Sequence, residues 1–303
     1  MKRAIRVAIP FIVAAFVASA CGGTGTSGGT KPAITIGSTN FSEQLVLGEL
    51  YSQILEANGY AVTRKFNLGN REIVFPALQS GQIDLEADYL ATLLAFVDKT
   101  ATGSTDPKVT AAALQKALTP KGVTVLDYAP AVDQNGFVVT KATADKYKLV
   151  KLSDVAPIGN QLVMGGPAEC PNREFCALGL KNKYGITFKE FKALDTGGPL
   201  TVQALVGGQI DVGLLFTSDS TIAVRGFVLL EDDKQLQLSD NVAPVVRNDY
   251  LTKAGDDFKK VVNSIAPKLT TAELTGMNKL VEVDKKDPKD VAKEWLKKQG
   301  LIK

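Results

Sequence analysis

Hydrophobic and polar residues follow two different periods along this chain, and the alternation of these periods predicts alternating strands and helices. Short β-branched or apolar runs such as Ile34–Gly37 and residues 83–87 indicate strands. Between them, apolar residues recur at helical spacing, for example Leu47, Leu50 and Tyr51. Strands and helices that alternate in this way favour an α/β fold.

One combination of these patterns occurs twice. Residues 77–85 read ALQSGQIDL and residues 204–212 read ALVGGQIDV. Each copy has the pattern of a helix end, a glycine turn and an Ile-Asp step into a buried strand. Two copies of one helix–turn–strand unit predict two similar lobes, and we expect a ligand to bind between them.

Polar side chains follow the predicted strands at the places where α/β proteins bind ligands. The first repeat strand is followed by Asp88, Tyr89 and Thr92, and the second by Thr217 and Ser218. Ligands of open α/β sheets lie at the carboxyl ends of the strands. These five residues are therefore candidate ligand contacts.

The first strand leads into a helix start that is rich in polar residues. Asn40 and Glu43 have the spacing of a capping box, and Gln44 follows them. Free backbone N–H groups and a partial positive charge at such an end suit a carboxylate. The alternative is that the polar side chains only cap the helix, and the sequence leaves both readings open. Asn70 lies in the turn before the next predicted helix and is a further candidate.

The chain begins with features of an export signal. Lys2, Arg3 and Arg6 precede an apolar run over residues 9–20 that is too short for a membrane-spanning helix, which needs about 20 residues. The tetrapeptide at residues 18–21 resembles a bacterial lipobox, with Ala18 where leucine is commoner. We expect residues 1–20 to be a lipoprotein signal peptide. Cys21 would then be the lipidated residue, within a flexible tether over residues 21–31.

Charge and cysteine content fit an extracytoplasmic protein. Loss of the three leader cations reduces the 35 basic residues to the same number as the 32 acidic residues, which argues against a nucleic-acid binder. Cys170 and Cys176 remain as a pair, and outside the cytoplasm a disulfide is expected. A metal site would need other ligands nearby, and the chain has no histidine. We predict no metal and no cofactor.

Two other functional classes fit the sequence less well. Without histidine, a hydrolase with a Ser-His-Asp or Cys-His site is excluded, and no carboxylate pair stands out among the 32 acids. We therefore expect no enzymatic activity. An adhesion module would present exposed recognition loops, whereas the repeats here end in buried strands.

The C-terminal part is predicted to be helical. Thr270 and Glu273 have capping-box spacing, and Asp287 with Pro288 indicates the start of a last helix. Trp295 falls on the apolar face of that helix, so we expect it in the core rather than in a ligand site.

Five segments together resemble one protein family. They are IGSTNFSEQLVLGELY (36–51), RKFNLGN (64–70), the paired GQID steps, APVVR (243–247) and DPKDVAKEWLKKQGLI (287–302). In this order they are similar to the substrate-binding proteins of ABC importers for glycine betaine, choline, carnitine and related osmoprotectants. The resemblance covers residues 34–302.

The resemblance implies a two-lobe periplasmic-binding-protein fold of type II, in which each lobe is a sheet flanked by helices. Lobe I would comprise residues 32–136 and 244–303, lobe II residues 137–243, and two crossing strands would form a hinge. It also implies that the closed protein delivers its ligand to a membrane permease driven by a separate ATPase. Together with the lipobox, this leads us to expect an extracytoplasmic, lipid-anchored monomer.

By resemblance, four positions match the family's ligand site. Asn40 and Gln44 match the helix start that holds a carboxylate, while Tyr89 and Phe216 match aromatic residues that contact a quaternary ammonium group. Where relatives carry further aromatic residues, this chain has carboxylates and amides, at Asp133, Asn135, Asp240 and Asn241. Either Asp133 or Asp240 neutralises a cationic ligand, or the ligand is a neutral polyhydroxy or phenolic compound. Both alternatives stay open here.

Overall fold

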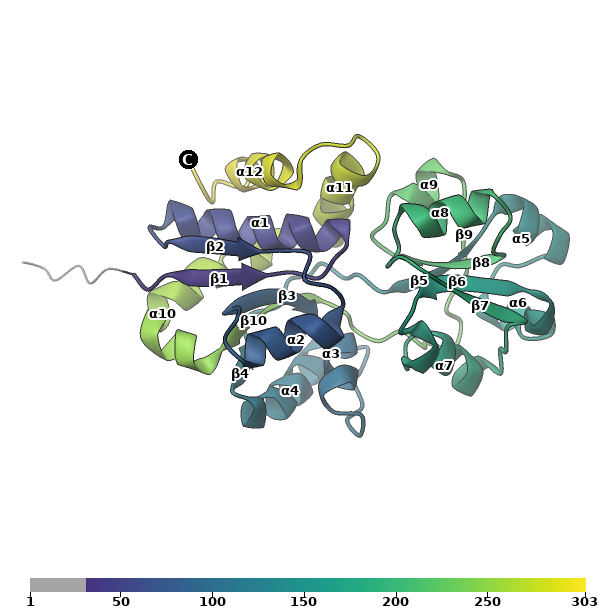
Figure 1. Cartoon of the computed structure of the whole chain (residues 1–303), viewed down its shortest axis with the longest axis horizontal. Coiled ribbons are helices and arrows are strands. Elements are labelled where there is room, and N and C mark those ends of the chain that lie inside the picture. The colour runs from purple at the N-terminus through teal and green to yellow at the C-terminus, as the bar shows by residue number, and fades with distance from the viewer. Residues whose placement is uncertain (1–30) are drawn as a thin grey trace, which may run out of the picture. The chain divides into compact units, whose positions relative to one another are not determined.

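The computed structural model describes residues 31–303, which form two five-stranded sheets with helices on both faces (Figure 1). We call the first sheet with its helices lobe I and the second sheet with its helices lobe II. The predictions for the leader, Cys21 and the tether concern residues that lie almost wholly outside this part of the chain. Within the described residues, no helix is both long and apolar enough to cross a bilayer.

The sheet of lobe I has the strand order β2-β1-β3-β10-β4. Strands β1 and β2 are parallel, as are β1 and β3, whereas β10 is antiparallel to both β3 and β4. The strands are β1 (Ile34–Gly37), β2 (Val62–Lys65), β3 (Leu85–Tyr89), β4 (Val123–Val125) and β10 (Val242–Arg247). The helices are α1 (Ser42–Ala57), α2 (Arg71–Gln79), α3 (Leu90–Val97), α4 (Pro107–Leu118), α10 (Asn248–Asn263), α11 (Thr271–Glu282) and α12 (Pro288–Lys298).

The sheet of lobe II repeats this arrangement with the order β7-β6-β8-β5-β9. Its first three strands are again parallel, and β5 is antiparallel to β8 and β9. The strands are β5 (Asn135–Val139), β6 (Val163–Pro167), β7 (Glu190–Leu194), β8 (Val212–Phe216) and β9 (Val228–Leu229). The helices are α5 (Lys141–Tyr147), α6 (Leu152–Val155), α7 (Ala177–Gly179), α8 (Pro199–Val206) and α9 (Thr221–Val224). The predicted α/β class with two similar lobes is confirmed.

The two sequence repeats have the same local geometry. After each helix, a glycine takes a positive φ, 77° at Gly81 and 65° at Gly208, which a residue without a side chain adopts without strain. The following Asp then bonds the parallel strand next to the one that it leads into. The Asp84 carboxylate accepts from the Thr35 N–H at 2.8 Å, and the Asp211 carboxylate accepts from the Val163 N–H at 2.9 Å. The repeated Asp therefore fixes the position of a strand and does not contact the ligand cavity.

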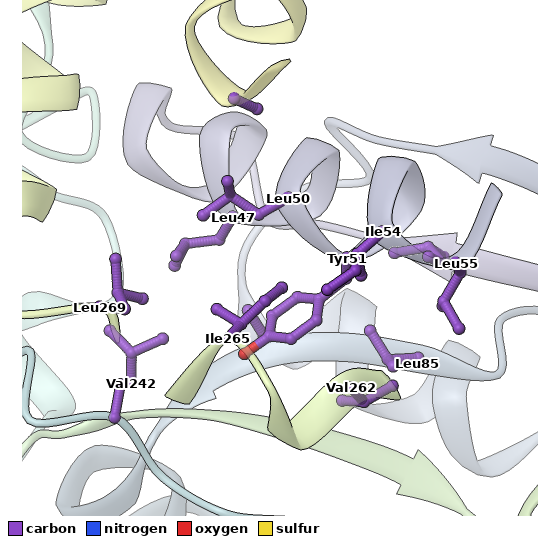
Figure 2. Packing of buried hydrophobic residues seen from close by; sticks show 14 of the residues in the cluster. Leu47, Leu50, Tyr51, Ile54, Leu55, Leu85, Val242, Val262, Ile265 and Leu269 are labelled. Atoms are coloured by element: carbon purple, nitrogen blue, oxygen red, sulfur yellow. The ribbon is translucent and has the colours of Figure 1, made fainter. Parts of the chain in front are cut away.

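Strand alternation divides the core of lobe I between the two faces of its sheet. Leu85, Ala87 and Tyr89 pack beneath α1, whereas Ala243 and Val245 pack against α2, α3 and α4. Figure 2 shows the α1 side, where side chains of α1 lie over the sheet and over α10. Each buried leucine or isoleucine there contributes about 1.5–3 kcal/mol. This packing holds α1, and with it the helix start that reaches the cavity, against the sheet.

The helix caps agree only in part with the sequence. Asp106, Thr270 and Asp287 accept from backbone N–H groups as N-caps, in agreement with the sequence pattern. Glu273 does not complete a capping box, because its carboxylate accepts from Trp295 Nε1 at 2.9 Å and from Lys298. Trp295 is buried in the lobe I core as expected.

Two segments connect the lobes, one before β5 and one before β10. They pair with each other at Val132 and Asn241, and the Asp133 N–H donates to the Asp240 carbonyl at 3.0 Å. The predicted boundaries at 136/137 and 243/244 fall inside strands, because β5 begins at Asn135 and β10 at Val242. The predicted strand at residues 83–87 is also displaced, since β3 runs from Leu85 to Tyr89.

Candidate functional site

A cavity of about 540 Å³ lies between the two lobes. This volume falls within the usual range for small-molecule sites. Lobe I contributes the start of α1, the start of α2, the end of β3 and helix α3. Lobe II contributes the end of β8, the start of β5 and the loop that contains Cys170 and Cys176.

Most of the predicted site residues lie in the wall of this cavity. Ten of them line it, from both lobes and from the connecting segments: Asn40, Gln44, Asn70, Asp88, Tyr89, Thr92, Asp133, Asn135, Phe216 and Asp240.

The other three predicted residues hold the surrounding backbone. Asn241 donates from Nδ2 to the Ala129 carbonyl, and Thr217 accepts from the Gln134 N–H. Ser218 donates from Oγ to the buried carboxylate of Glu43. Their predicted role in direct ligand contact is not supported by their position outside the cavity wall.

The predicted capping box at the start of α1 is wrong. The N-cap residue is Phe41, and it makes no side-chain capping bond. The Glu43 side chain instead points into the protein, with 2% of its surface exposed. There its carboxylate accepts three hydrogen bonds, each of 2.6 Å, from Tyr89 Oη, Ser218 Oγ and Asn278 Nδ2. Since these donors come from both lobes, Glu43 links them.

Burial raises the pKa of Glu43, while the hydrogen bonds from Ser218, Tyr89 and Asn278 oppose that rise. Burial likewise raises the pKa of the Tyr89 hydroxyl well above its usual value, with a further contribution from the Glu43 charge. Tyr89 therefore remains a protonated donor to Glu43 at neutral pH.

Aromatic rings from both lobes meet at the cavity. Phe41 stacks with Phe216 at a centroid distance of 4.8 Å and with Tyr89 at 6.4 Å. Phe96 and Phe175 add further aromatic surface to the wall. Only Tyr89 and Phe216 were predicted from the sequence. Phe41 belongs to the quoted NFSEQ segment, but no sequence pattern indicates its contact with the cavity.

A buried ion pair forms part of the lobe I side of the wall. Arg71 holds the Asp88 carboxylate with two nitrogens, the shortest distance being 2.6 Å from Nη2, and also donates to Thr92 Oγ1. The charge of Asp88 is therefore already neutralised by the protein. The sequence reasoning named Asp88 and Thr92 but missed Arg71, although it directly follows Asn70.

Asp133 and Asp240 differ from Asp88 because no Arg or Lys of residues 31–303 pairs with them. Asp133 accepts from the Ser218 N–H at 3.0 Å, and Asp240 accepts from the Thr92 N–H at 2.8 Å. Burial raises the pKa of Asp133 well above its usual value and that of Asp240 to about 7. A bound cation would lower both pKa values and restore the negative charges.

Part of the lobe II wall is a loop that a disulfide holds. Cys170 and Cys176 are bonded, as the sequence predicted, and both line the cavity. Between them, Arg173 reaches from lobe II to Glu72 at the start of α2, with a nitrogen–oxygen distance of 2.8 Å. Neither Arg173 nor Glu72 was predicted, because nothing local in the sequence indicates a contact between residues so far apart.

No metal site accompanies the cavity. The chain has no histidine, and the structure of residues 31–303 places no three Cys, Asp or Glu side chains where they could hold an ion together. The wall combines carboxylates, amides, hydroxyls and aromatic rings with the basic side chains of Arg71, Lys99 and Arg173. Such groups bind and orient a small molecule.

Comparison with known protein families gives one match over most of the chain. A family model described as the substrate binding domain of ABC-type glycine betaine transport system matches residues 32–298. The chain is 28% identical over 289 residues to the carnitine transport binding protein OpuCC of Listeria monocytogenes, which covers 94% of this chain and 92% of that protein. It is 24% identical over 280 residues to the glycine betaine-binding protein YehZ of Escherichia coli, with 89% and 92% covered.

Solved structures show the same architecture. A crystal structure of a glycine betaine/carnitine/choline ABC transporter protein matches with a TM-score of 0.69 and 28% identity, over 88% of this chain and 99% of that chain. Lactococcal OpuAC, in a closed conformation with glycine betaine, matches with a TM-score of 0.64. At 16% identity over 89% of this chain and 96% of that chain, the second match establishes the fold alone. The two-lobe periplasmic-binding-protein fold expected from the sequence is confirmed.

Proposed function

Because the chain belongs to the family of substrate-binding domains of ABC-type glycine betaine transport systems, we propose that it captures an osmoprotectant-type molecule between its lobes. Candidate ligands are glycine betaine, choline, carnitine and similar small cations or zwitterions. The family resemblance inferred from the sequence motifs is thereby confirmed. Members of this family are transport proteins that act outside the cytoplasm, and they bind their ligands without chemical conversion. We propose the same for this chain.

The observation that carries the proposal is the pair of buried carboxyl groups in the cavity wall that form no ion pair within residues 31–303. Asp133 and Asp240 are 3% and 1% exposed, and neither has a basic partner in the described part of the chain. Burying such charges is costly unless a positive group joins them. A cationic ligand supplies that group, whereas a neutral polyhydroxy or phenolic ligand does not.

Other parts of the wall suit the remainder of such a ligand. The N-terminal end of α1, with Asn40, carries a partial positive charge that favours a carboxylate. The Phe216 and Tyr89 rings in the wall offer apolar surface for methyl groups, and a ring face attracts a cation by about 0.5–2 kcal/mol. We assign these residues to ligand contact, together with Asn135 and Asn70.

Release to a permease requires the cavity to open. We propose that the two connecting segments, paired at Val132 and Asn241, act as a hinge between the lobes. The protein would work as a monomer beside a membrane permease and its ATPase. Lipidation of Cys21 would keep it at the membrane surface, and that residue lies outside the described part of the chain.

Titration calorimetry tests the proposal directly. The purified protein is titrated with glycine betaine, choline, carnitine, a polyol and a phenol, and we expect binding of a cation or zwitterion only. The Asp133→Asn variant should weaken that binding at least tenfold. Asp127→Asn, which removes an exposed acidic charge outside the cavity, should leave it unchanged. Binding of neutral ligands alone, or equal effects of the two substitutions, would overturn the proposal.

A further inference from the structure

One ion pair in the cavity wall joins the two lobes. Arg173 lies in the segment between Cys170 and Cys176, which we call the disulfide loop, and donates from Nη2 to both carboxylate oxygens of Glu72, at 3.0 and 2.8 Å. Glu72 lies in the first turn of α2 in lobe I. Both side chains line the cavity. We call this ion pair the latch, because the lobes cannot separate at this point unless it breaks.

The disulfide loop holds Arg173 in place from within lobe II. The Phe175 carbonyl accepts from Asn135 Nδ2 at 2.8 Å and from Gln237 Nε2 at 2.9 Å, so two side-chain amides fix the backbone of the loop. The Glu169 carboxylate also lies 3.2 Å from Arg173 Nη2. A side chain that is held in this way loses less conformational freedom when it pairs with the other lobe. The latch is therefore prepared on the lobe II side before it closes.

The latch is weak enough to break each time the cavity opens. The side chains of Arg173 and Glu72 are 29% and 40% exposed, and ion pairs that water reaches are much weaker than buried ones. Hinge opening must break this pair before a ligand leaves. An interaction that exists only when the lobes are closed shifts the equilibrium toward closure by its own free energy.

The other contacts between the lobes at the cavity are buried. Glu43 and Ser218 share a hydrogen bond of 2.6 Å, and the rings of Phe41 and Phe216 stack. Changing these residues would also disturb the ring surfaces that we assign to ligand contact. The latch differs from them because its two charges can be exchanged between the lobes without a change in the total charge of the cavity.

We infer that Glu72 and Arg173 set the rate at which the cavity releases its ligand. They are positioning residues, which act by holding the lobes closed and not by touching the ligand. The inference rests on the proposed function, because it concerns release from the same cavity. The ligand enters before the lobes close, so the latch slows dissociation and leaves association almost unchanged.

Reversing the charges of the latch tests the inference. NMR exchange measurements on the methyl protons of glycine betaine or choline give the dissociation rate constant from the full chain, and calorimetry gives Kd. Glu72→Arg and Arg173→Glu should each raise the dissociation rate constant about fivefold, with the association rate constant unchanged within about twofold. The double variant restores the ion pair with opposite polarity and should release ligand at nearly the wild-type rate.

A matched control comes from an ion pair within one lobe. Glu56 is 41% exposed and pairs with Arg64 inside lobe I, at 2.6 Å. Glu56→Arg makes the same change of charge as Glu72→Arg without touching a contact between lobes. It should leave both rate constants unchanged. An equal effect of the two substitutions would overturn the inference, since it would reduce the latch to a general effect of charge.

Two further outcomes would also overturn the inference. One is unchanged dissociation in Glu72→Arg, and the other is a double variant that releases ligand as fast as the single variants, as expected if the two charges contact the ligand. Binding of neither compound, nor of any other cation, overturns the proposed function instead. Small-angle scattering of the ligand-free protein then decides the inference. Glu72→Arg should have a larger radius of gyration than the wild type and the double variant should not, and equal radii in all three would overturn it.

Discussion

Ser218 donates a hydrogen bond of 2.6 Å from its Oγ to Oε2 of Glu43, although the two residues are 175 positions apart. Ser218 follows the last strand residue of β8 in lobe II, and Glu43 lies in the first turn of α1 in lobe I. The same glutamate accepts from Tyr89 and from Asn278 of α11. One buried carboxylate thus connects both lobes and Tyr89, whose hydroxyl accepts from Gln44 Nε2.

Replacing Ser218 with Ala should destabilise the protein. The substitution removes one donor from a buried carboxylate that keeps two others, so we expect a loss of about 1.5–3 kcal/mol in the free energy of unfolding. Urea denaturation measures this change. Ser80→Ala provides the control, because Ser80 is exposed and bonds only a nearby carbonyl. A loss no larger than that of the control would show that the contact between lobes contributes nothing to stability.

Removing Arg71 should cost more than removing any exposed arginine. Its side chain is 11% exposed and that of Asp88 is 5% exposed, so Arg71→Ala would leave the Asp88 charge buried without a partner. We expect a destabilisation of about 3–5 kcal/mol in urea denaturation. Arg225→Ala, at an exposed arginine, should stay within about 0.5 kcal/mol. The prediction fails if the two variants unfold at the same urea concentration.

Asp240 should make the stability of the ligand-free protein depend on pH. Burial raises its pKa from 3.8 to about 7, with Asp88 adding to the rise and Arg71 and backbone N–H groups opposing it. The folded protein then binds more protons than the unfolded chain between these two values. The contribution of Asp240 to stability is therefore present below pH 4 and is lost as pH rises toward 7, by about 4 kcal/mol in total. Asp240→Asn should remove this loss, so that the variant is more stable than the wild type at pH 8.

Ligand affinity should show the opposite dependence on pH. A cation is attracted by the ionised form of Asp240, so binding should weaken as pH falls below about 7, by up to tenfold per pH unit. Asp133, whose pKa is also raised, faces the same cavity and should strengthen the trend. Calorimetric titrations from pH 5 to 8 measure it. An affinity that does not change over this range would exclude the carboxylates from cation binding.

The disulfide should contribute to both stability and ligand binding. Replacing Cys170 and Cys176 together with Ala removes a short covalent loop, which costs about 2–3 kcal/mol in the chain-entropy model. Because both residues line the cavity and Arg173 of the same loop pairs with Glu72, ligand affinity should also fall. Thermal unfolding with and without reductant provides the comparison. The wild type should shift to lower temperature on reduction and the double variant should not.

The sequence predicted the fold well because the fold depends on local patterns that are repeated. Gly81 and Gly208 mark two turns of the same conformation, and each is followed by an Asp that bonds the neighbouring strand. Strand ends were less certain. The strand was predicted over residues 83–87 because Ile83 is apolar and β-branched. Its pairing with β1 is at Leu85, and β3 runs from Leu85 to Tyr89.

The cavity was predicted less completely because its wall depends on contacts between distant residues. Asp88 and Tyr89 follow a recognisable strand and were found. Glu43 has the spacing of a capping residue, and only its position opposite Ser218 and Asn278 gives it another role. Arg173 and Glu72 are separated by 101 positions, and no local pattern brings them together.

Trp295 is the single tryptophan of the chain, and it lies in α12, outside the cavity wall. Its Nε1 donates to Glu273, and its ring is buried among the helices that cover one face of lobe I. Intrinsic tryptophan emission from this protein therefore comes from one buried residue that does not line the cavity. The emission will follow the melting of lobe I, and ligand binding will leave its wavelength almost unchanged.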